Sequence, residues 1–526
     1  MVRILILALV VLRGAWPQMP QYDLLIRNAR VIDGTGNAWF RGDVAIANGR
    51  IAAVGRLNEA KAARTINAAG RVLAPGFIDV HTHIEQGIEK VPRADNYLLD
   101  GVTSVVTGNC GGSETDLAAW FRQLESTGIG INIASLIGHN AVRSAVIGTA
   151  QREATPEEMD RMQSLVDQAM RDGAVGFSTG LIYVPGTYAN TDEVIALARA
   201  AAKHGGVYAS HIRNEGPRVM EAITEAATVG RDTGLPVQIS HFKIDTKSLW
   251  GMSEKTVALI EEFRREGVDV VVDQYPYERS STTLSTTLPS WALADGNKAI
   301  VERLSSPETR ARIIAEMLDG LKRKGQQDYS YATVATFRPD TTLEGRTISE
   351  INVLKGRPRT PEAEAETILD LILAMDGGRV QMVYHTMGDA DIDRILRYPH
   401  TAIASDGGVR EFGLGVPHPR SYGTNARVLA EYVRRRRVIT LEDAIRRMTS
   451  LPARTFGFRE RGLVREGFAA DLVLFDPARV EDKATYAKPH AYSEGFDWVF
   501  VNGVPVVEDD TPNAALPGRI IRRGGP

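Results

Sequence analysis

The chain has 526 residues, 43% of them hydrophobic and 24% charged, and this length is sufficient for a large buried core and more than one domain. Its 62 basic and 65 acidic residues nearly balance, giving a formal charge of −3, so charge provides no case for binding nucleic acid or an anionic membrane. The single cysteine, Cys110, excludes intrachain disulfide bonds.

Residues 1–21 form a leader for which the sequence allows two interpretations. Arg3 and the apolar run at 4–12 are typical of a signal peptide with a short hydrophobic region. Arg13 follows this run at once, however, and no clear cleavage site comes next. We therefore expect either a cytoplasmic protein with an upstream extension or a protein exported to the periplasm. Because the run is too short to span a bilayer, we expect no stable membrane insertion.

Both ends of the remaining chain have the pattern of short strands. Residues 22–75 alternate apolar and polar positions and are broken by Asn-Gly and Asp-Gly pairs, which are typical of β-hairpins. Residues 458–526 repeat this pattern, most clearly at 470–477 and 498–507. The two ends therefore predict one small β-sandwich domain to which both contribute.

The middle of the chain, residues 76–457, alternates predicted strands and helices. This order favours parallel β/α units and an α/β fold with a (β/α)8 TIM barrel. We expect the barrel strands at residues 76–81, 103–107, 131–137, 174–178, 207–211, 237–241, 268–275 and 402–406. Residues 379–386 also have a strand pattern, so the seventh strand has two candidates.

Residues 279–360 do not fit the alternation of strand and helix. They contain a Ser/Thr cluster at 280–287 and a basic stretch at 322–324. A segment of this length between barrel elements predicts an inserted subdomain before the last strand, placed near the active-site face where it can act as a lid.

Metal-binding side chains follow several of the predicted barrel strands. Barrel enzymes carry their catalytic groups at the C-terminal ends of the strands, so these side chains are expected to meet. Imidazole, thiolate and carboxylate are the ligands that zinc prefers. The residues at these positions are His81, His83, Cys110, His211, His241 and Asp406.

Each of these residues has a simpler explanation when taken alone. A lone cysteine is usually a small buried side chain, a strand histidine is usually hydrogen-bonded in the core, and Asp406 before glycine is typical of a turn. Their combination favours a metal site. His81 and His83 point to the same face of an extended segment, and a Ser-His pair closes two successive strands, at 210–211 and 240–241. His139 also follows a strand, without an assigned role.

Short motifs run through the barrel and into the last strands. They occupy residues 74–83, 107–111, 176–186, 210–215, 240–243, 273–277, 405–407, 418–420 and 467–477. Through these motifs the chain resembles the D-aminoacylase (N-acyl-D-amino-acid deacylase) family of the amidohydrolase superfamily over nearly all of residues 22–510. The stretch 424–429 departs from the more aromatic, proline-containing form expected after the motif at 418–420.

The resemblance implies a zinc site. Related hydantoinases and dihydroorotases bridge two metals with a carbamylated lysine, but this chain has no lysine between Lys90 and Lys203, which leaves Cys110 as the candidate. The implied ligands of one tight zinc are Cys110, His211 and His241, and His81 and His83 would form a second, weaker position. Asp406 would act as the general base toward a metal-bound water.

The resemblance also implies a substrate site. Lys243, Tyr275 and Arg420 would bind a substrate carboxylate, and Tyr183 would orient the amide that is cut. An arginine can bind a carboxylate through two hydrogen bonds. The simpler interpretation of the two basic residues is surface ion pairing.

These expectations define a function and its alternatives. The first is zinc-dependent hydrolysis of a small anionic N-acyl-D-amino acid; the second is hydrolysis of another anionic amide, such as a dipeptide or an acylated xenobiotic. A catalytically silent scaffold is a third, and the filled ligand positions speak against it. Substrate chirality, the number of metals and the oligomeric state stay open at this stage.

Overall fold

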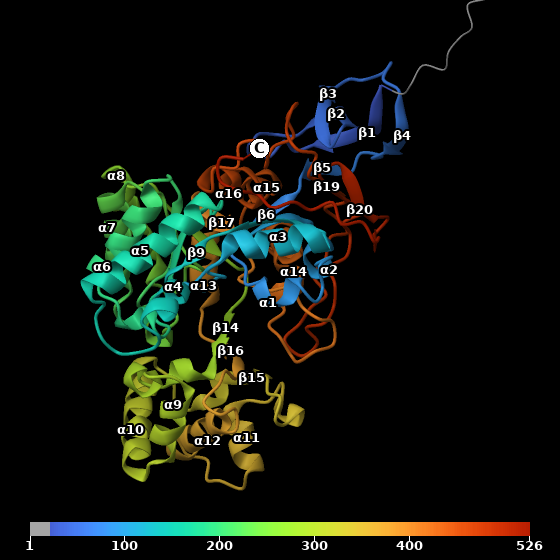
Figure 1. Ribbon diagram of the computed structural model, residues 1–526. Coiled ribbons are helices and arrows are strands. Elements are labelled where there is room, and N and C mark those ends of the chain that lie inside the picture. Colours follow the sequence, from blue (N-terminus) through green and yellow to red (C-terminus); the bar gives the residue numbers. More distant parts are fainter. Residues whose placement is uncertain (1–20, 526) are drawn as a thin grey trace, which may run out of the picture.

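The computed structural model describes residues 21–525, so the leader predicted at 1–21 lies outside the described residues apart from Gln21. Figure 1 shows a central barrel ringed by helices, a β-rich domain at one end, and a mostly helical insertion at the other. Within residues 21–525, no helix combines the length and the apolar character needed to cross a membrane.

Eight parallel strand segments within residues 76–457 form the barrel. The strands pair in chain order in two sheets. The first sheet contains the first three barrel strands, and the second continues from the third strand to the last. Backbone bonds from the Asp406 N–H to the His81 oxygen (2.8 Å) and from the His83 N–H to the Gly407 oxygen (2.7 Å) join the last strand to the first. The predicted (β/α)8 barrel is confirmed. Its strands are β6 (Phe77–Asp79), β7 (Val102–Thr107), β8 (Asn132–Ser135) continued by β9 (Ile137–Gly138), β10 (Gly176–Gly180), β11 (Val207–His211), β12 (Val237–Ile239), β13 (Val270–Gln274) and β17 (Thr401–Ile403).

Helices pack around the outside of the barrel (Figure 1). Helix α5 illustrates why they form where they do: Thr155 caps the Glu158 N–H, the Glu158 side chain bonds back to Thr155, and Pro156 occupies the first turn. The helices are α1 (Glu85–Ile88), α2 (Asp95–Leu98), α3 (Leu117–Thr127), α4 (His139–Val146), α5 (Pro156–Arg171), α6 (Thr191–Ala202), α7 (Val219–Thr233), α8 (Ser253–Arg265), α13 (Asp389–Arg397), α14 (Arg420–Arg427), α15 (Leu441–Met448) and α16 (Ser450–Thr455).

The inserted subdomain has its own sheet and core. Strands β14 (Arg279–Thr283) and β15 (Ala332–Thr336) both pair with β16 (Gln381–His385), and four helices cover them. These helices are α9 (Asn297–Ser305), α10 (Pro307–Arg323), α11 (Ile348–Leu354) and α12 (Pro361–Leu373). Met382 and Tyr384 of β16 pack into this separate core. The subdomain therefore continues past its predicted end at residue 360, and β13, not the segment at 379–386, is the seventh barrel strand.

The β-rich domain is a nine-stranded sheet to which both ends of the chain contribute. Strand β5 is parallel to β1 and antiparallel to β18, which joins the two halves. The sheet folds back so that residues of β1–β3 and of β18–β19 share one core. Its strands are β1 (Tyr22–Val31), β2 (Phe40–Ala47), β3 (Arg50–Gly55), β4 (Ala62–Asn67), β5 (Val72–Pro75), β18 (Leu472–Phe475), β19 (Trp498–Val501), β20 (Val504–Glu508) and β21 (Thr511–Pro512).

Candidate metal centre

The predicted metal-binding residues meet at the C-terminal ends of the barrel strands. His81 and His83 follow β6, Cys110 follows β7, His211 ends β11, and His241 and Asp406 follow β12 and β17. Parallel strands bring these ends to one face of the barrel. Three groups of potential ligand atoms therefore lie within 4.8 Å of one another: His81, His83 and Cys110; Cys110, His211 and His241; and His81, His241 and Asp406.

The Cys110 thiol is at the centre of this arrangement. Its Sγ lies 3.3 Å from Nε2 of His81, 3.6 Å from Nδ1 of His211 and 3.5 Å from Nε2 of His241. Cys110 has a positive φ of 52°, as do His241 (35°) and Asp406 (50°). Such conformations are costly for residues other than glycine and concentrate at functional sites, where the surrounding structure holds them.

The charges at the centre suit a cation. Burial alone would raise the pKa of the Cys110 thiol, but the imidazoles of His81 and His241 hold this pKa well below its usual value. A thiolate is the form of cysteine that binds metals. One thiolate and three imidazole nitrogens within a few ångströms match the donors of a zinc site, so the residues present fit this metal.

Asp406 and His83 form the second part of the centre. Oδ1 of Asp406 lies 3.1 Å from Nε2 of His83 and 3.6 Å from Nε2 of His81. The His83 side chain is 39% exposed, whereas that of His81 is fully buried. Although burial alone would raise it, the pKa of Asp406 is lowered by the nearby charges of Arg420 and His81, so its carboxylate form is favoured.

Two buried aspartates orient this centre, and sequence reasoning gave them no role. Oδ2 of Asp273 lies 3.3 Å from Nδ1 of His81, and Oδ1 accepts the His241 N–H at 2.8 Å. Asp79 accepts the N–H groups of His81 and Ser405, each at 3.1 Å, and burial raises its pKa to about 6. Both lie in motifs quoted above, which was the available signal.

Glu215 is a third carboxylate without a predicted role. Its Oε1 lies 2.6 Å from Nζ of Lys243 and 3.0 Å from Nδ1 of His241. Burial would raise the pKa of Glu215, but the charges of Lys243, His211 and His241 lower it below its usual value. It closes the motif at 210–215, four residues after His211.

The predicted carboxylate-binding residues also lie close together. The two basic ones form ion pairs within the protein, Lys243 with Glu215 and Arg420 with Asp406. Lys243 lies 5.9 Å and Arg420 lies 4.6 Å from the ring centre of Tyr275. Nη1 of Arg420 lies 2.9 Å from Oδ2 of Asp406. Neither basic side chain is a surface residue, since each is only 5% exposed.

Tyr183 connects the centre to the inserted subdomain. Its ring centre lies 4.9 Å from that of His211, and its hydroxyl lies 3.0 Å from the Thr282 hydroxyl of β14. The same strand accepts a hydrogen bond from Arg420 at the Ser281 oxygen (3.2 Å). The insertion therefore forms part of the wall of the site.

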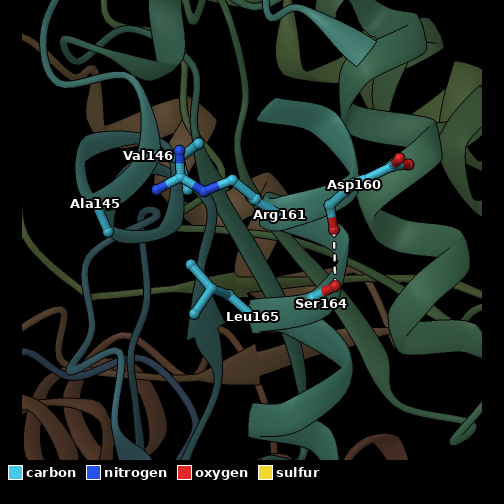
Figure 2. A pocket seen from close by; sticks show the side chains of 6 residues that line it. All are labelled: Ala145, Val146, Asp160, Arg161, Ser164 and Leu165. Atoms are coloured by element: carbon cyan, nitrogen blue, oxygen red, sulfur yellow. Dashed lines mark hydrogen bonds between the residues drawn. The ribbon is translucent and has the colours of Figure 1, made fainter. Parts of the chain in front are cut away.

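Two further features lie apart from the centre. His139 is fully buried, with Nε2 2.9 Å from Glu193, which also pairs with Arg143, so it belongs to a structural ion-pair cluster. A surface pocket of about 480 Å³ lies at α4 and α5 (Figure 2), where the Ser164 hydroxyl donates to the Asp160 backbone oxygen. Its lining includes none of the predicted site residues, and we assign it no function.

A closed barrel with histidines, one thiol and a carboxylate at its strand ends is typical of a metal-dependent barrel enzyme. The amidohydrolase family model matches residues 64–507. An N-acyl-D-glutamate deacylase of Alcaligenes xylosoxydans xylosoxydans is 36% identical over 95% of this chain and 96% of that protein. The chain therefore belongs to the amidohydrolase family, and within it to the D-aminoacylase group.

Two solved structures share the whole fold. One is a D-aminoacylase with a binuclear metal centre, in which one metal activates and the second attenuates. It is 34% identical, with a TM-score of 0.81, and the match covers 95% of this chain and 100% of that one. The N-acyl-D-glutamate deacylase of Bordetella bronchiseptica, complexed with zinc and a phosphonate mimic of the tetrahedral intermediate, is also 34% identical, with a TM-score of 0.80 and coverages of 95% and 99%.

Proposed function

We propose that this protein hydrolyses the amide bond of N-acyl-D-amino acids, giving a carboxylate and a free D-amino acid, with one tightly bound zinc. The observation that carries the proposal is the convergence of three imidazole nitrogens within 3.6 Å of the Cys110 thiol. The proposed substrate class is supported by the relatives, which are an N-acyl-D-glutamate deacylase, a D-aminoacylase and an N-acyl-D-aspartate deacylase.

Cys110, His211 and His241 would hold the tight zinc, and His81 and His83 would offer the weaker second position. When bound, zinc polarises the amide carbonyl and lowers the pKa of a coordinated water. The more exposed His83 supports a weaker position, since solvent competes there for the ligand and the ion. One-metal activation and second-metal attenuation in the related D-aminoacylase also support this division.

Asp406 is the proposed general base. Its carboxylate lies beside His81 and His83, where it can take a proton from the attacking water and deliver it to the leaving nitrogen. Arg420 at 2.9 Å keeps this group in its charged, proton-accepting form.

Arg420, Lys243 and Tyr275 are the proposed partners of the substrate carboxylate, since both basic groups lie within 5.9 Å of the centre of the Tyr275 ring. Two nearly buried positive charges favour an anionic substrate, because desolvated ion pairs are strong when their hydrogen bonds are complete. Tyr183, held by Thr282, would orient the amide, and the insertion would shape the pocket for the acyl group or side chain.

A paired substrate screen tests this function. Purified protein is assayed for zinc content and for release of amino acid from matched N-acetyl-D- and N-acetyl-L-amino acids, together with dipeptides. We expect turnover of the D-forms with about one zinc per chain. Turnover of L-forms or dipeptides alone would contradict the proposed substrate, and zinc binding without any turnover would favour a silent scaffold.

A further inference from the structure

Glu215 lies at the metal centre, and the proposed hydrolysis gives it no task. It follows strand β11, and its side chain is 10% exposed. Oε1 contacts both Nδ1 of His241 (3.0 Å) and Nζ of Lys243 (2.6 Å), and Oε2 lies 3.8 Å from Nε2 of His211. This carboxylate therefore touches a proposed zinc ligand and a proposed substrate-binding residue at once.

Nδ1 of His241 lies between a hydrogen-bond acceptor, the Glu215 carboxylate, and a hydrogen-bond donor, the Lys243 ammonium. The Glu215 carboxylate only accepts hydrogen bonds, whereas the Lys243 ammonium, 2.8 Å from the same nitrogen, only donates them. Nδ1 can satisfy one of these neighbours and not both.

The choice decides whether the histidine can bind a metal. If Nδ1 accepts from Lys243, the ring hydrogen sits on Nε2, which faces the Cys110 thiol at 3.5 Å and then has no free lone pair. If Nδ1 donates to Glu215, the lone pair on Nε2 is available. Carboxylates that accept from the second nitrogen of a ligating histidine fix its tautomer in this way.

We propose that Glu215 is a positioning residue that selects the metal-binding tautomer of His241. It does so in two ways: it accepts the hydrogen of Nδ1, and it engages the Lys243 ammonium that would otherwise donate to that nitrogen. The inference rests on the proposed zinc site and deepens it, because it makes metal affinity depend on a residue that is not a ligand.

The centre contains a useful internal comparison. Asp273 approaches Nδ1 of His81 at 3.3 Å, and the other side chain it holds is Gln238 at 2.8 Å. No ammonium group is hydrogen-bonded to Nδ1 of His81 within the described structure. Competition between a carboxylate and a lysine is therefore found at His241 and not at His81 among the described residues. At His241, Lys243 should weaken zinc binding only when Glu215 is missing.

The test measures zinc affinity, not activity. Metal-free protein is titrated with zinc against a chromogenic chelator for the wild type, Glu215→Ala, Lys243→Met and the double variant. We expect Glu215→Ala to bind zinc about 10- to 100-fold more weakly. Lys243→Met should bind like the wild type, and the double variant should regain most of the lost affinity because no donor then reaches Nδ1.

Glu225→Gln is the matched control. Glu225 is also a largely buried carboxylate (12% exposed) in an ion pair, with Arg213 at 2.8 Å, but it touches no proposed ligand. Its substitution should leave zinc affinity unchanged. If Glu215→Ala does not fold, as judged by circular dichroism, the comparison is made with Glu215→Met and Glu215→Met/Lys243→Met, whose side chain fills the space of glutamate without a strong acceptor or donor, and the same order of affinities is expected.

Two results would overturn the inference: wild-type zinc affinity in the folded Glu215 variants, or a double variant as weak as the single Glu215 variant. A failure of the proposed function gives a different pattern. Protein that shows the expected order of zinc affinities but cleaves no N-acyl-amino acid would refute the hydrolysis and leave the role of Glu215 intact.

Discussion

Cys110 illustrates how a residue's neighbours change its chemistry. It lies in a left-handed turn after β7 with three imidazole nitrogens within 3.6 Å of its sulfur. We predict that Cys110→Ser, which replaces a thiolate by a poor zinc ligand, weakens zinc binding at least about 100-fold, more than the loss of a supporting group would. Zinc retained after dialysis measures this, with His204→Gln as the control, because His204 pairs with Asp167 and not with a proposed ligand.

For Asp406 we predict the opposite: a substitution that lowers the rate of hydrolysis without changing zinc binding. Asp406→Asn keeps the shape of the side chain and removes its ability to accept a proton. We expect zinc content to stay at the wild-type level while kcat falls roughly 10²- to 10⁴-fold, the usual contribution of a general base. A variant that retained its kcat would show that another group takes the proton.

At this scale, the sequence identified the residues with obvious metal chemistry but not the carboxylates behind them. His81, His211 and His241 could be found because each follows an apolar strand. Glu215 and Asp273 were missed although both lie in the quoted motifs, since an acidic residue near a strand end is ordinary until the fold shows which ring nitrogen it faces. Glu215 faces Nδ1 of His241, 26 positions away in sequence, and Asp273 faces Nδ1 of His81, 192 positions away.

Among the elements, strand β14 has the clearest functional consequence. It belongs to the insertion, yet its Thr282 hydroxyl is 3.0 Å from that of Tyr183. We predict that Thr282→Val lowers kcat/KM about fivefold, equivalent to one hydrogen bond of about 1 kcal/mol, without changing zinc content. Thr287→Val is the control, because that hydroxyl donates to the Leu284 backbone oxygen within the insertion. Equal effects of the two variants would argue against a role for β14 in the site.

The strand predicted at 379–386 shows what the sequence pattern could not predict, namely which sheet a strand joins. Alternation and apolar runs located the barrel strands, because each is buried and several are followed by a polar site residue. The same reasoning gave 379–386 as a candidate barrel strand, since β16 is equally apolar at alternate positions. Only its antiparallel pairing with β14 and β15 assigns it to the insertion. Pairing partners depend on the tertiary fold and leave no local signal.

For the whole molecule, Asp100 links distant parts of the chain. Its carboxylate accepts hydrogen bonds from the backbone N–H groups of Asn425 (2.8 Å) and Ala426 (3.0 Å) and from the Ser493 hydroxyl (2.8 Å). Burial raises its pKa to about 7, although these hydrogen bonds oppose the rise. Because the folded state binds this proton more tightly than the unfolded chain does, stability falls as pH rises from about 4 to about 7.

We therefore predict that Asp100→Asn removes this component of the pH dependence. Each pH unit in the window is worth up to roughly 1.4 kcal/mol. Urea denaturation midpoints of zinc-free protein at pH 5 and pH 8 should differ more for the wild type than for Asp100→Asn. The same difference in both proteins would mean that Asp100 does not titrate in this range.

The β-rich domain joins the two ends of the chain, and this has a consequence for synthesis. Arg50 pairs with Glu460, 410 positions later, and β5 completes its sheet only with β18. While the ribosome is still making the barrel, strands β1–β5 are already exposed with an unpaired edge, a form prone to aggregation. Closing such a distant contact is slow, so the β-rich domain is expected to fold last although its first strands emerge first.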